Sequence, residues 1–339
     1  MFEITVLNQE ETIRLLKMPE VVGVVEDVYK MKAKGESEVF PLVFHEFNPG
    51  VADMDIKSGW LRGSGIWGMK VVSWFGENPK KGLPALVGTV LVFDDKTGAP
   101  TGMLDGAHIT GMRTGAAGAL GAKYLARPNS ETLLLVGAGH VATFQIAALL
   151  PLMAGIKRVL IYDGLSYAGA QKFAAGIAEK LRGSFGIETE GTVTFAATED
   201  IAAATAESDI IITVTPSKTP IIKKDWVKPG THFSCIGADM SGKEEIDPAI
   251  FAGARVFCDD IPQCVNVGEV EIPVATGVIK KEDIAGEIGE VVLGTTPGRQ
   301  SAEQITIFDA TGTALLDLLT ANLALKAAKE QGLGSTVNL

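Results

Sequence analysis

The sequence predicts an α/β fold whose larger part is a doubly wound parallel sheet. From residue 131 onward, short apolar segments typical of buried strands alternate with helix-forming segments. A glycine-rich turn, VGAGHVA at 136–142, joins the first of these strands to the first helix. The chain has 339 residues, which is enough for two domains that share a large buried core.

The first 128 residues form the other predicted domain, of mixed α and β structure. We expect a helix over 10–34, strands over 39–44, 68–74 and 88–93, a hairpin turn over 96–100 and a helix over 110–126. The glycine-rich segment 59–68 disfavours a helix and predicts a loop. Because the residue before a proline avoids helical geometry, Pro128 ends the last helix and marks the domain boundary.

The second part contains most of the predicted strands. They lie at 132–136, 158–162, 193–196, 209–214, 232–236, 255–258 and 305–308, with helices at 168–181 and 199–206 between them. A strong helix-forming run follows at 314–330, and the residues after it predict a loosely ordered tail.

Composition excludes several classes of protein. Lys and Arg number 30 against 41 Asp and Glu, a net charge of −11 without a basic cluster, so no nucleic-acid partner is expected. Three cysteines at uninformative spacing indicate free thiols in a reducing compartment. The acidic N-terminus has no long apolar segment typical of a secretory signal, and we predict a cytoplasmic protein.

One stretch is long enough to cross a membrane. Residues 132–156 carry no formal charge, and about 20 apolar residues span a bilayer. The stretch nevertheless contains His140, Gln145, Pro151 and three glycines, and it divides into a strand, a turn and a helix. The buried strand–turn–helix therefore accounts for the apolarity better, and no membrane association is expected.

The turn at 136–142 has the G-x-G-x-x-A pattern of a dinucleotide-binding site. Gly137 permits a tight turn, Gly139 lets the backbone approach a pyrophosphate, and Ala142 allows the helix to pack closely on the strand. Asp163 ends the next predicted strand, where a carboxylate binds the adenosine ribose hydroxyls and favours NAD over NADP. The alternative is a glycine-rich turn in a domain that binds no nucleotide.

Three further side chains are candidates for substrate chemistry. Lys70 lies in an apolar strand-like run, where a lysine either extends to the surface or has a function. Arg113 suits a substrate carboxylate, although a surface arginine near a helix start is the alternative. Asp239 follows a strand, at the sheet edge where such folds bind ligands, or it is a turn residue. No metal-ligand spacing occurs, so no metal site is predicted.

Several motifs in order resemble the ornithine cyclodeaminase/μ-crystallin family. They are GMKVVSWFGENP, TGAPTGMLDGAHITGMRTGAAGALGAKYLARP, VGAGHVA, CIGADMSGKEEID and GEIGEVVLGTTPGRQSAEQITIFDATGTALLD. The resemblance implies a Rossmann-type doubly wound sheet, the NAD-binding domain at 129–311, inserted into a mixed α+β domain. That second domain, 1–128 plus 312–339, would bind substrate and form a homodimer.

The resemblance also implies chemistry on a small amino acid or imine. In the cyclodeaminase branch an amino acid is oxidised at Cα to an imine, the ring closes, ammonia leaves, and the same cofactor returns its hydride. This lyase reaction is the leading expectation. The alternatives are an NAD(P)-dependent amino acid dehydrogenase or cyclic imine reductase, which are oxidoreductases of amino acid metabolism, and a member that only binds small ligands.

Residue roles carried over by motif complete the expected site. Asp239 and Lys70 would be catalytic, with Lys70 also contacting the substrate carboxylate or imine beside Arg113. Thr311 would lie near the substrate. The remaining positions would line the cofactor: Gly137, Gly139, His140, Val141, Asp163, Thr89, Thr215, Lys243 and Ala310.

Three departures from the family pattern stand out, one at the cofactor and two that concern substrate identity. Val141 stands where relatives usually have Gln, which changes one cofactor contact. The stretch SEVFPLVF offers Glu38 where ornithine-specific members carry an Arg in the strand before the lysine strand, so the carboxylate clamp has one arginine fewer. Residues 45–67 also depart from the family, in a region expected to form a pocket wall.

Overall fold

A computed structural model of the chain describes residues 2–339 and divides them into two compact units. Unit 1 contains the residues up to Arg113 together with Thr313–Leu339, and unit 2 contains Thr114–Gly312. The boundary expected after residue 128 thus falls earlier, inside helix α3 (Gly106–Leu125). A Cβ on Gly115 or Gly121 would come within 2.3 Å of Phe144 or Phe308, so this half of α3 is packed tightly within unit 2.

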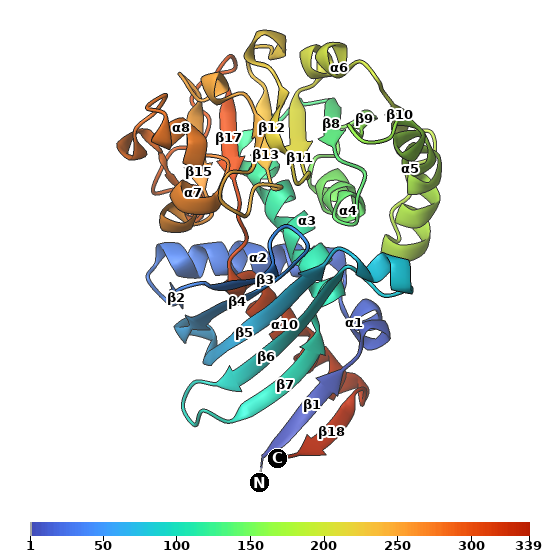
Figure 1. Cartoon of the computed structure of the whole chain (residues 1–339), viewed down its shortest axis with the longest axis vertical. Helices are drawn as coiled ribbons and strands as arrows, with labels where there is room; N and C mark the ends of the chain where they lie inside the picture. Colours follow the sequence, from blue (N-terminus) through green and yellow to red (C-terminus); the bar gives the residue numbers. More distant parts are fainter. Residues whose placement is uncertain (1) are drawn as a thin grey trace. The chain divides into compact units, whose positions relative to one another are not determined.

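Unit 1 is an eight-stranded sheet with helices (Figure 1). Its strand order is β18-β1-β7-β6-β5-β4-β2, and β3 pairs with β4. The strands are β1 (Glu3–Leu7), β2 (Ser37–Val39), β3 (Val43–Asn48), β4 (Ala52–Leu61), β5 (Ile66–Phe75), β6 (Leu86–Asp94), β7 (Pro100–Asp105) and β18 (Ser335–Asn338). The helices are α1 (Gln9–Leu15), α2 (Met18–Ala33), the first part of α3, α10 (Ala314–Gln331) and two short 3₁₀ turns, Arg62–Ser64 and Asn78–Lys81.

The predicted loop at 59–68 is wrong, because its ends belong to the paired strands β4 and β5. Gly59 and Gly68 lie opposite each other, and a Cβ on either would come within 2.8 Å of Leu315 or Leu318 of α10. Glycine therefore serves close packing of helix α10 on the sheet instead of a turn. Residues 45–67, which we expect to form a pocket wall, consist mostly of the antiparallel pair β3–β4.

Both ends of the chain also differ from expectation. The helix predicted over 10–34 is two helices, because Leu16 and Lys17 are extended and Pro19 stands in the first turn of α2. The tail predicted to be loosely ordered forms β18, whose residues Ser335–Asn338 pair antiparallel with β1. Only the partner strand at the other end of the sequence makes this short polar segment a strand.

Unit 2 contains the predicted parallel sheet, in the order β10-β9-β8-β11-β13-β17-β15-β16. These strands are β8 (Thr132–Val136), β9 (Arg158–Tyr162), β10 (Thr194–Ala197), β11 (Ile210–Thr213), β13 (His232–Cys235), β15 (Arg255–Cys258), β16 (Gly286–Glu287) and β17 (Thr306–Asp309). A small second sheet pairs β12 (Lys218–Ile222) with β14 (Glu244–Ile246). The helices are α4 (Ala142–Leu152), α5 (Tyr167–Lys180), α6 (Ile201–Glu207), α7 (Ile261–Val267), α8 (Glu271–Ala275) and α9 (Ile288–Leu293). The short helical turns are Leu181–Phe185, Lys224–Trp226, Pro248–Ile250 and Lys281–Asp283.

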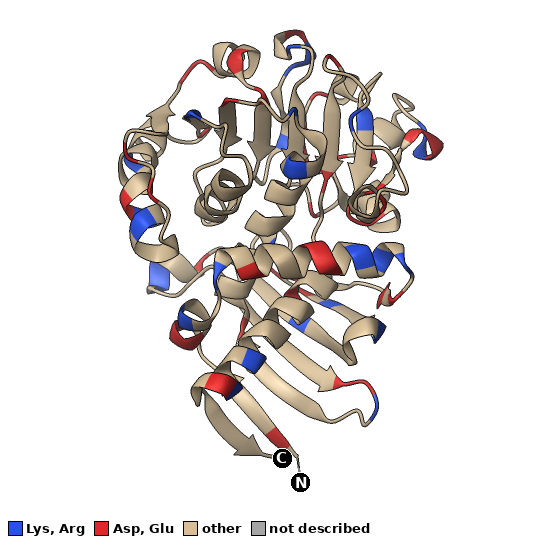
Figure 2. Cartoon of the chain, turned by 180° about the vertical axis from the view of Figure 1, so that it is seen from behind, with Lys and Arg blue, Asp and Glu red and all other residues tan. Residues whose placement is uncertain are grey.

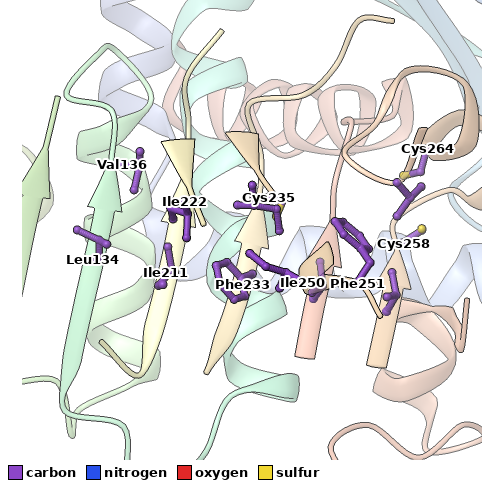
Figure 3. Packing of buried hydrophobic residues seen from close by; sticks show 14 of the residues in the cluster. Leu134, Val136, Ile211, Ile222, Phe233, Cys235, Ile250, Phe251, Cys258 and Cys264 are labelled. Carbon is purple, nitrogen blue, oxygen red and sulfur yellow. The ribbon is translucent and has the colours of Figure 1, made fainter. Parts of the chain in front are cut away.

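The sheet of unit 2 is buried on both faces, as continuous apolar strands require. Every residue of β11, β13 and β17 is buried, and so are four of the five residues of β8. Figure 3 shows Leu134, Ile211 and Phe233 from successive strands packed in one apolar cluster. The predicted doubly wound α/β fold is confirmed.

No helix among residues 2–339 is long and apolar enough to cross a membrane. The uncharged stretch 132–156 is divided mostly between β8 and α4, which ends at Leu152. Along α2 the acidic positions Glu26 and Asp27 precede the basic positions near its end, and Lys30 pairs with Glu26 at 3.0 Å (Figure 2).

Candidate active site

The glycine-rich turn of unit 2 has the conformation that a dinucleotide requires. Gly137 directly follows β8 with φ +108°, and its N–H donates to the carbonyl of Tyr162 on β9 at 2.8 Å. A Cβ there would be 3.0 Å from Thr215, so only glycine fits. Around Gly139 nothing lies within 4 Å of a Cβ position, which leaves room for a phosphate. Val141 is the N-cap residue of α4, and among the described residues no side chain caps the N-terminus of this helix.

Asp163 follows β9 at the same edge of the sheet. Its carboxylate accepts a hydrogen bond from Leu165 N–H at 3.0 Å, which fixes the turn that leads into α5. Gly164 and the 94% exposed Leu165 provide no cation for a 2′-phosphate. The local structure therefore suits a ribose with free hydroxyls.

Other candidate cofactor residues follow strands of this sheet. Thr215 comes two residues after β11, and Ala310 directly follows β17. Thr311 is buried, and its N–H and hydroxyl both donate to the carboxylate of Asp259, at 3.3 and 3.2 Å. The carboxyl ends of parallel strands meet at one edge, so the fold gathers these positions as expected.

Asp239 lies in the loop after β13, and its side chain is 48% exposed. Its carboxylate forms an ion pair with Lys243 at 2.5 Å, across one turn of the loop that leads to β14. The structure therefore brings together two residues that the sequence nominated for different roles. Lys243 holds the carboxylate in this exposed position, within reach of solvent and ligands.

In unit 1, Lys70 and Arg113 share one buried counterion. Lys70 Nζ lies 3.0 Å from one carboxylate oxygen of Asp317, and Arg113 Nε lies 3.2 Å from the other. The three side chains are at most 7% exposed. Burial and the nearby Arg113 charge lower the pKa of Lys70 to about 8, while Arg113 and Lys70 hold the pKa of Asp317 below its ordinary value.

Sequence reasoning missed Asp317, since it lies in a strongly helix-forming run far from the motifs of Lys70. It also missed Lys57, which lies directly opposite Lys70 in the β4–β5 register. Directly paired residues project to the same face of a sheet, and the charge of Lys57 lowers the pKa of Lys70 further. Both residues can be recognised only in the tertiary structure, from the pairing of β4 with β5 and the position of α10.

The sequence profile of the "Ornithine cyclodeaminase/mu-crystallin family" matches residues 3–332. The protein belongs to this family. Alanine dehydrogenase of Archaeoglobus fulgidus is 36% identical over 99% of this chain and 98% of that protein. Iminosuccinate reductase of Paracoccus denitrificans is 32% identical over 98% of this chain and 99% of that protein.

Solved structures of the family superpose over nearly the whole chain. An archaeal alanine dehydrogenase dimer with bound NAD has a TM-score of 0.90 at 35% identity, covering 99% of both chains. Thermococcus litoralis Δ¹-pyrroline-2-carboxylate reductase, in complex with NADH and L-proline, has a TM-score of 0.90 at 32% identity, covering 98% of this chain and all of the other. A lysine cyclodeaminase has a TM-score of 0.84 at 27% identity, covering 99% and 96%. These relatives agree with the expectation of an enzyme with NAD as cofactor.

Two positions singled out by the family resemblance lie away from the cation cluster. Thr89, which is expected to line the cofactor, pairs with Val71, so it projects to the face of the sheet opposite Lys70. Glu38 forms an exposed ion pair with Arg62 at 2.6 Å on the edge strand β2. The strand next to the lysine strand is β4, and its cation is Lys57. Lys57 thus adds a third positive charge beside Lys70 and Arg113.

One group in unit 2 has the composition of a metal site, although none was predicted. Cys258, Cys264 and Asp309 are buried with their ligand atoms within 4.8 Å of one another. Cys264 Sγ already donates to Asp259 at 3.3 Å, and Asp309 accepts from Val270 N–H at 3.0 Å. Burial raises the pKa of all three, Asp309 to about 8 and Cys258 to about 11. Metal ligands must be deprotonated, so the group is better described as a protonated internal network.

Proposed function

We propose that the protein is an NAD-dependent enzyme that interconverts a small α-amino acid and the corresponding α-imino acid, as a dehydrogenase or imine reductase. The observation that carries the proposal is the buried Lys70–Asp317–Arg113 cluster, with Lys57 opposite Lys70, in a chain whose other unit has a dinucleotide turn. Bound NAD would accept a hydride from the amino acid Cα, and NADH would return one to the imine.

The turn at Gly137, the space at Gly139 and the carboxylate of Asp163 fit NAD. We infer that the α4 N-terminus faces the pyrophosphate and that Asp163 accepts from the adenosine ribose. Thr215, Lys243 and Ala310 are the other proposed contacts, with His140 and Val141 in the turn itself. The geometry of Gly137 supports this assignment most directly, because no other residue fits there.

The cation cluster suits the carboxylate of such a substrate. Lys57, Lys70 and Arg113 concentrate positive charge around the buried carboxylate of Asp317, and such a group of cations suits a substrate carboxylate. With a pKa of about 8, Lys70 also exchanges a proton near neutral pH. We propose Asp239 as the second acid–base group, acting on the amine, and Thr311 as a neighbour of the substrate.

The cyclodeaminase reaction, the leading expectation from sequence, becomes the second candidate. Proteins named as dehydrogenase and reductase match this chain at 36% and 32% identity, and the lysine cyclodeaminase structure matches at 27%. The cation cluster also differs from the ornithine-specific pattern, since the strand beside the lysine strand carries Lys57 opposite Lys70 instead of an arginine. These observations support simple hydride transfer without ring closure.

The test is a substrate panel with two readouts, NADH absorbance and ammonia release. Alanine, aspartate, proline, lysine and ornithine are incubated with NAD⁺, and pyruvate with ammonium and pyrroline-2-carboxylate are incubated with NADH. We expect stoichiometric change in NADH with at least one pair. Ammonia release from ornithine or lysine without net NADH would establish cyclodeamination, and NADH binding without any turnover would establish a binding protein.

Lys57→Met tests the clamp within the same assay. We expect KM for the carboxylate substrate to rise about tenfold, the effect of losing roughly one charge-assisted contact, with the affinity for NADH unchanged. Lys81→Met, an exposed lysine on the turn after β5, is the matched control. An unchanged KM in Lys57→Met would remove Lys57 from the proposed site.

We also propose a homodimer formed through unit 1. Large apolar side chains are exposed on β3, β5 and β6 and the turn between the last two: Val43, Phe44, Phe47, Phe75, Leu83, Leu86 and Val87. Such a concentration is typical of a protein interface, and the archaeal alanine dehydrogenase is a dimer. Light scattering after gel filtration should give twice the mass of 35.6 kDa, and a monomeric mass at micromolar concentration would contradict the proposal.

A further inference from the structure

One buried carboxylate joins two loops at the cofactor edge of unit 2. Glu245 on β14 is fully buried, and one of its oxygens accepts from Thr215 N–H at 2.6 Å and from the Thr215 hydroxyl at 2.7 Å. The other oxygen accepts from Gly237 N–H at 3.0 Å. Thr215 follows β11 and Gly237 follows β13, two neighbouring strands of the sheet. A single side chain therefore sets the separation of the two loops.

The carboxylate of Glu245 packs directly against Gly237. A Cβ on Gly237 would lie 2.6 Å from the Glu245 carboxyl carbon and 2.2 Å from the carbonyl oxygen of Thr215. Glycine at 237 is thus required by the close approach of the carboxylate and the neighbouring loop. A fully buried carboxylate is costly unless it is hydrogen-bonded, and these three donors meet that need.

A second carboxylate holds the strand that carries Glu245. Glu269 accepts from the N–H groups of Glu245 and Ile246 at 2.8 and 2.7 Å. Burial raises the pKa of Glu245 to about 6, and burial together with the Glu245 charge raises that of Glu269 well above its ordinary value. The three donors that point at Glu245 favour its charged form, which is the form that binds both loops.

We propose that Glu245 is the positioning residue of the reaction, since it fixes the loop of Thr215 against the cofactor and the loop of Asp239 for proton transfer. Asp239 comes two residues after Gly237, so the Gly237 hydrogen bond anchors the start of its loop. This inference rests on the proposed function for the role of Asp239. The anchoring itself depends only on the hydrogen bonds.

The substitution Glu245→Gln distinguishes the anchoring of one loop from that of the other. An amide has one acceptor oxygen, and the two donors of Thr215 favour its placement there. The amide NH₂ then meets Gly237 N–H, donor against donor, and the loop of Asp239 is released while that of Thr215 is kept. Glu244→Gln is the matched control, because Glu244 is the neighbour of Glu245 on β14 and its Oε1 is buried without a hydrogen-bond partner among the described residues.

Amide hydrogen exchange measures the anchoring without any turnover. In Glu245→Gln we expect exchange of the segment 236–241 to rise roughly tenfold or more, while β8 exchanges as in the wild type. Glu244→Gln should match the wild type throughout. Unchanged exchange of 236–241 in Glu245→Gln would overturn the inference, whatever reaction the protein catalyses.

Kinetics measure the consequence. In Glu245→Gln we expect kcat to fall on the order of 10- to 100-fold and its pH profile to shift, with NADH stoichiometry and affinity within about threefold of wild type. An unchanged kcat and pH profile, or a loss of kcat matched by an equal loss of NADH sites, would overturn the positioning role. Absence of wild-type turnover on the whole panel would instead refute the proposed function, and hydrogen exchange would still decide the anchoring.

Discussion

Replacing Asp317 by Asn tests whether the buried cation cluster is an integrated unit. The substitution keeps the shape of the side chain and removes the one negative charge that Lys70 and Arg113 share. The two cations respond differently. Lys70, with a pKa of about 8, releases its proton at a cost of about 1 kcal/mol at pH 7, whereas Arg113 cannot. Leaving a buried charge unpaired costs about 3–5 kcal/mol.

We therefore expect Asp317→Asn to lose about 3–5 kcal/mol of unfolding free energy, measured by urea titration followed by circular dichroism. The pH dependence is diagnostic. Lys70 binds a proton more weakly in the folded than in the unfolded protein, so stability rises with pH above its folded pKa. In the wild type this gain begins near pH 8, and in Asp317→Asn it begins below pH 7, so the variant should gain about 1 kcal/mol between pH 7 and 8.

The control is Glu330→Gln, at an exposed position near the end of the same helix, which should change stability by less than about 0.5 kcal/mol. The double variant Asp317→Asn, Lys70→Met should lose less than the sum of the two single losses, because each removes part of the same interaction. Stability within about 1 kcal/mol of wild type in Asp317→Asn, or additive losses in the double variant, would refute the reasoning.

Three other predictions concern binding. KM for the carboxylate substrate should rise as pH increases through about 8, because Lys70 loses its charge, and a flat profile from pH 7 to 9 would exclude Lys70 from the clamp. Gly137→Ala should cost about 1–2 kcal/mol of stability, because φ is +108° there, and it should weaken NADH binding at least tenfold in a fluorescence titration. Gly139→Ala should weaken NADH binding without loss of stability. Asp163→Ser combined with Leu165→Arg should shift preference toward NADPH, which the ratio of kcat/KM for the two cofactors measures, and an unchanged ratio would place the ribose elsewhere.

The nucleotide turn could be predicted from the sequence because interactions between neighbouring residues determine it. The turn at Gly137, Asp163 after the next strand and the apolar strands of unit 2 are determined within a few residues of each position, by backbone sterics and by burial on both faces. The predicted strands of unit 2 accordingly match the structure to within about two residues.

Unit 1 was less predictable because its strands depend on partners. Gly59 and Gly68 predict a loop in isolation, yet they lie in strands because α10 packs directly on them. The polar tail is a strand because β1 lies beside it. Neither fact is available to reasoning about neighbouring residues, since the partners lie at the other end of the chain.

The sequence by itself therefore determined the fold class, the nucleotide turn and the identity of several polar residues. Tertiary structure decided how those residues act. Lys70 and Asp317 are 247 positions apart and meet at 3.1 Å, and Lys57 joins them through strand register. Glu245 binds two loops that converge only when β11 and β13 are paired. Charges and hydrogen bonds fall off within a few ångströms, so their effects depend on folded distances that the order of residues does not record.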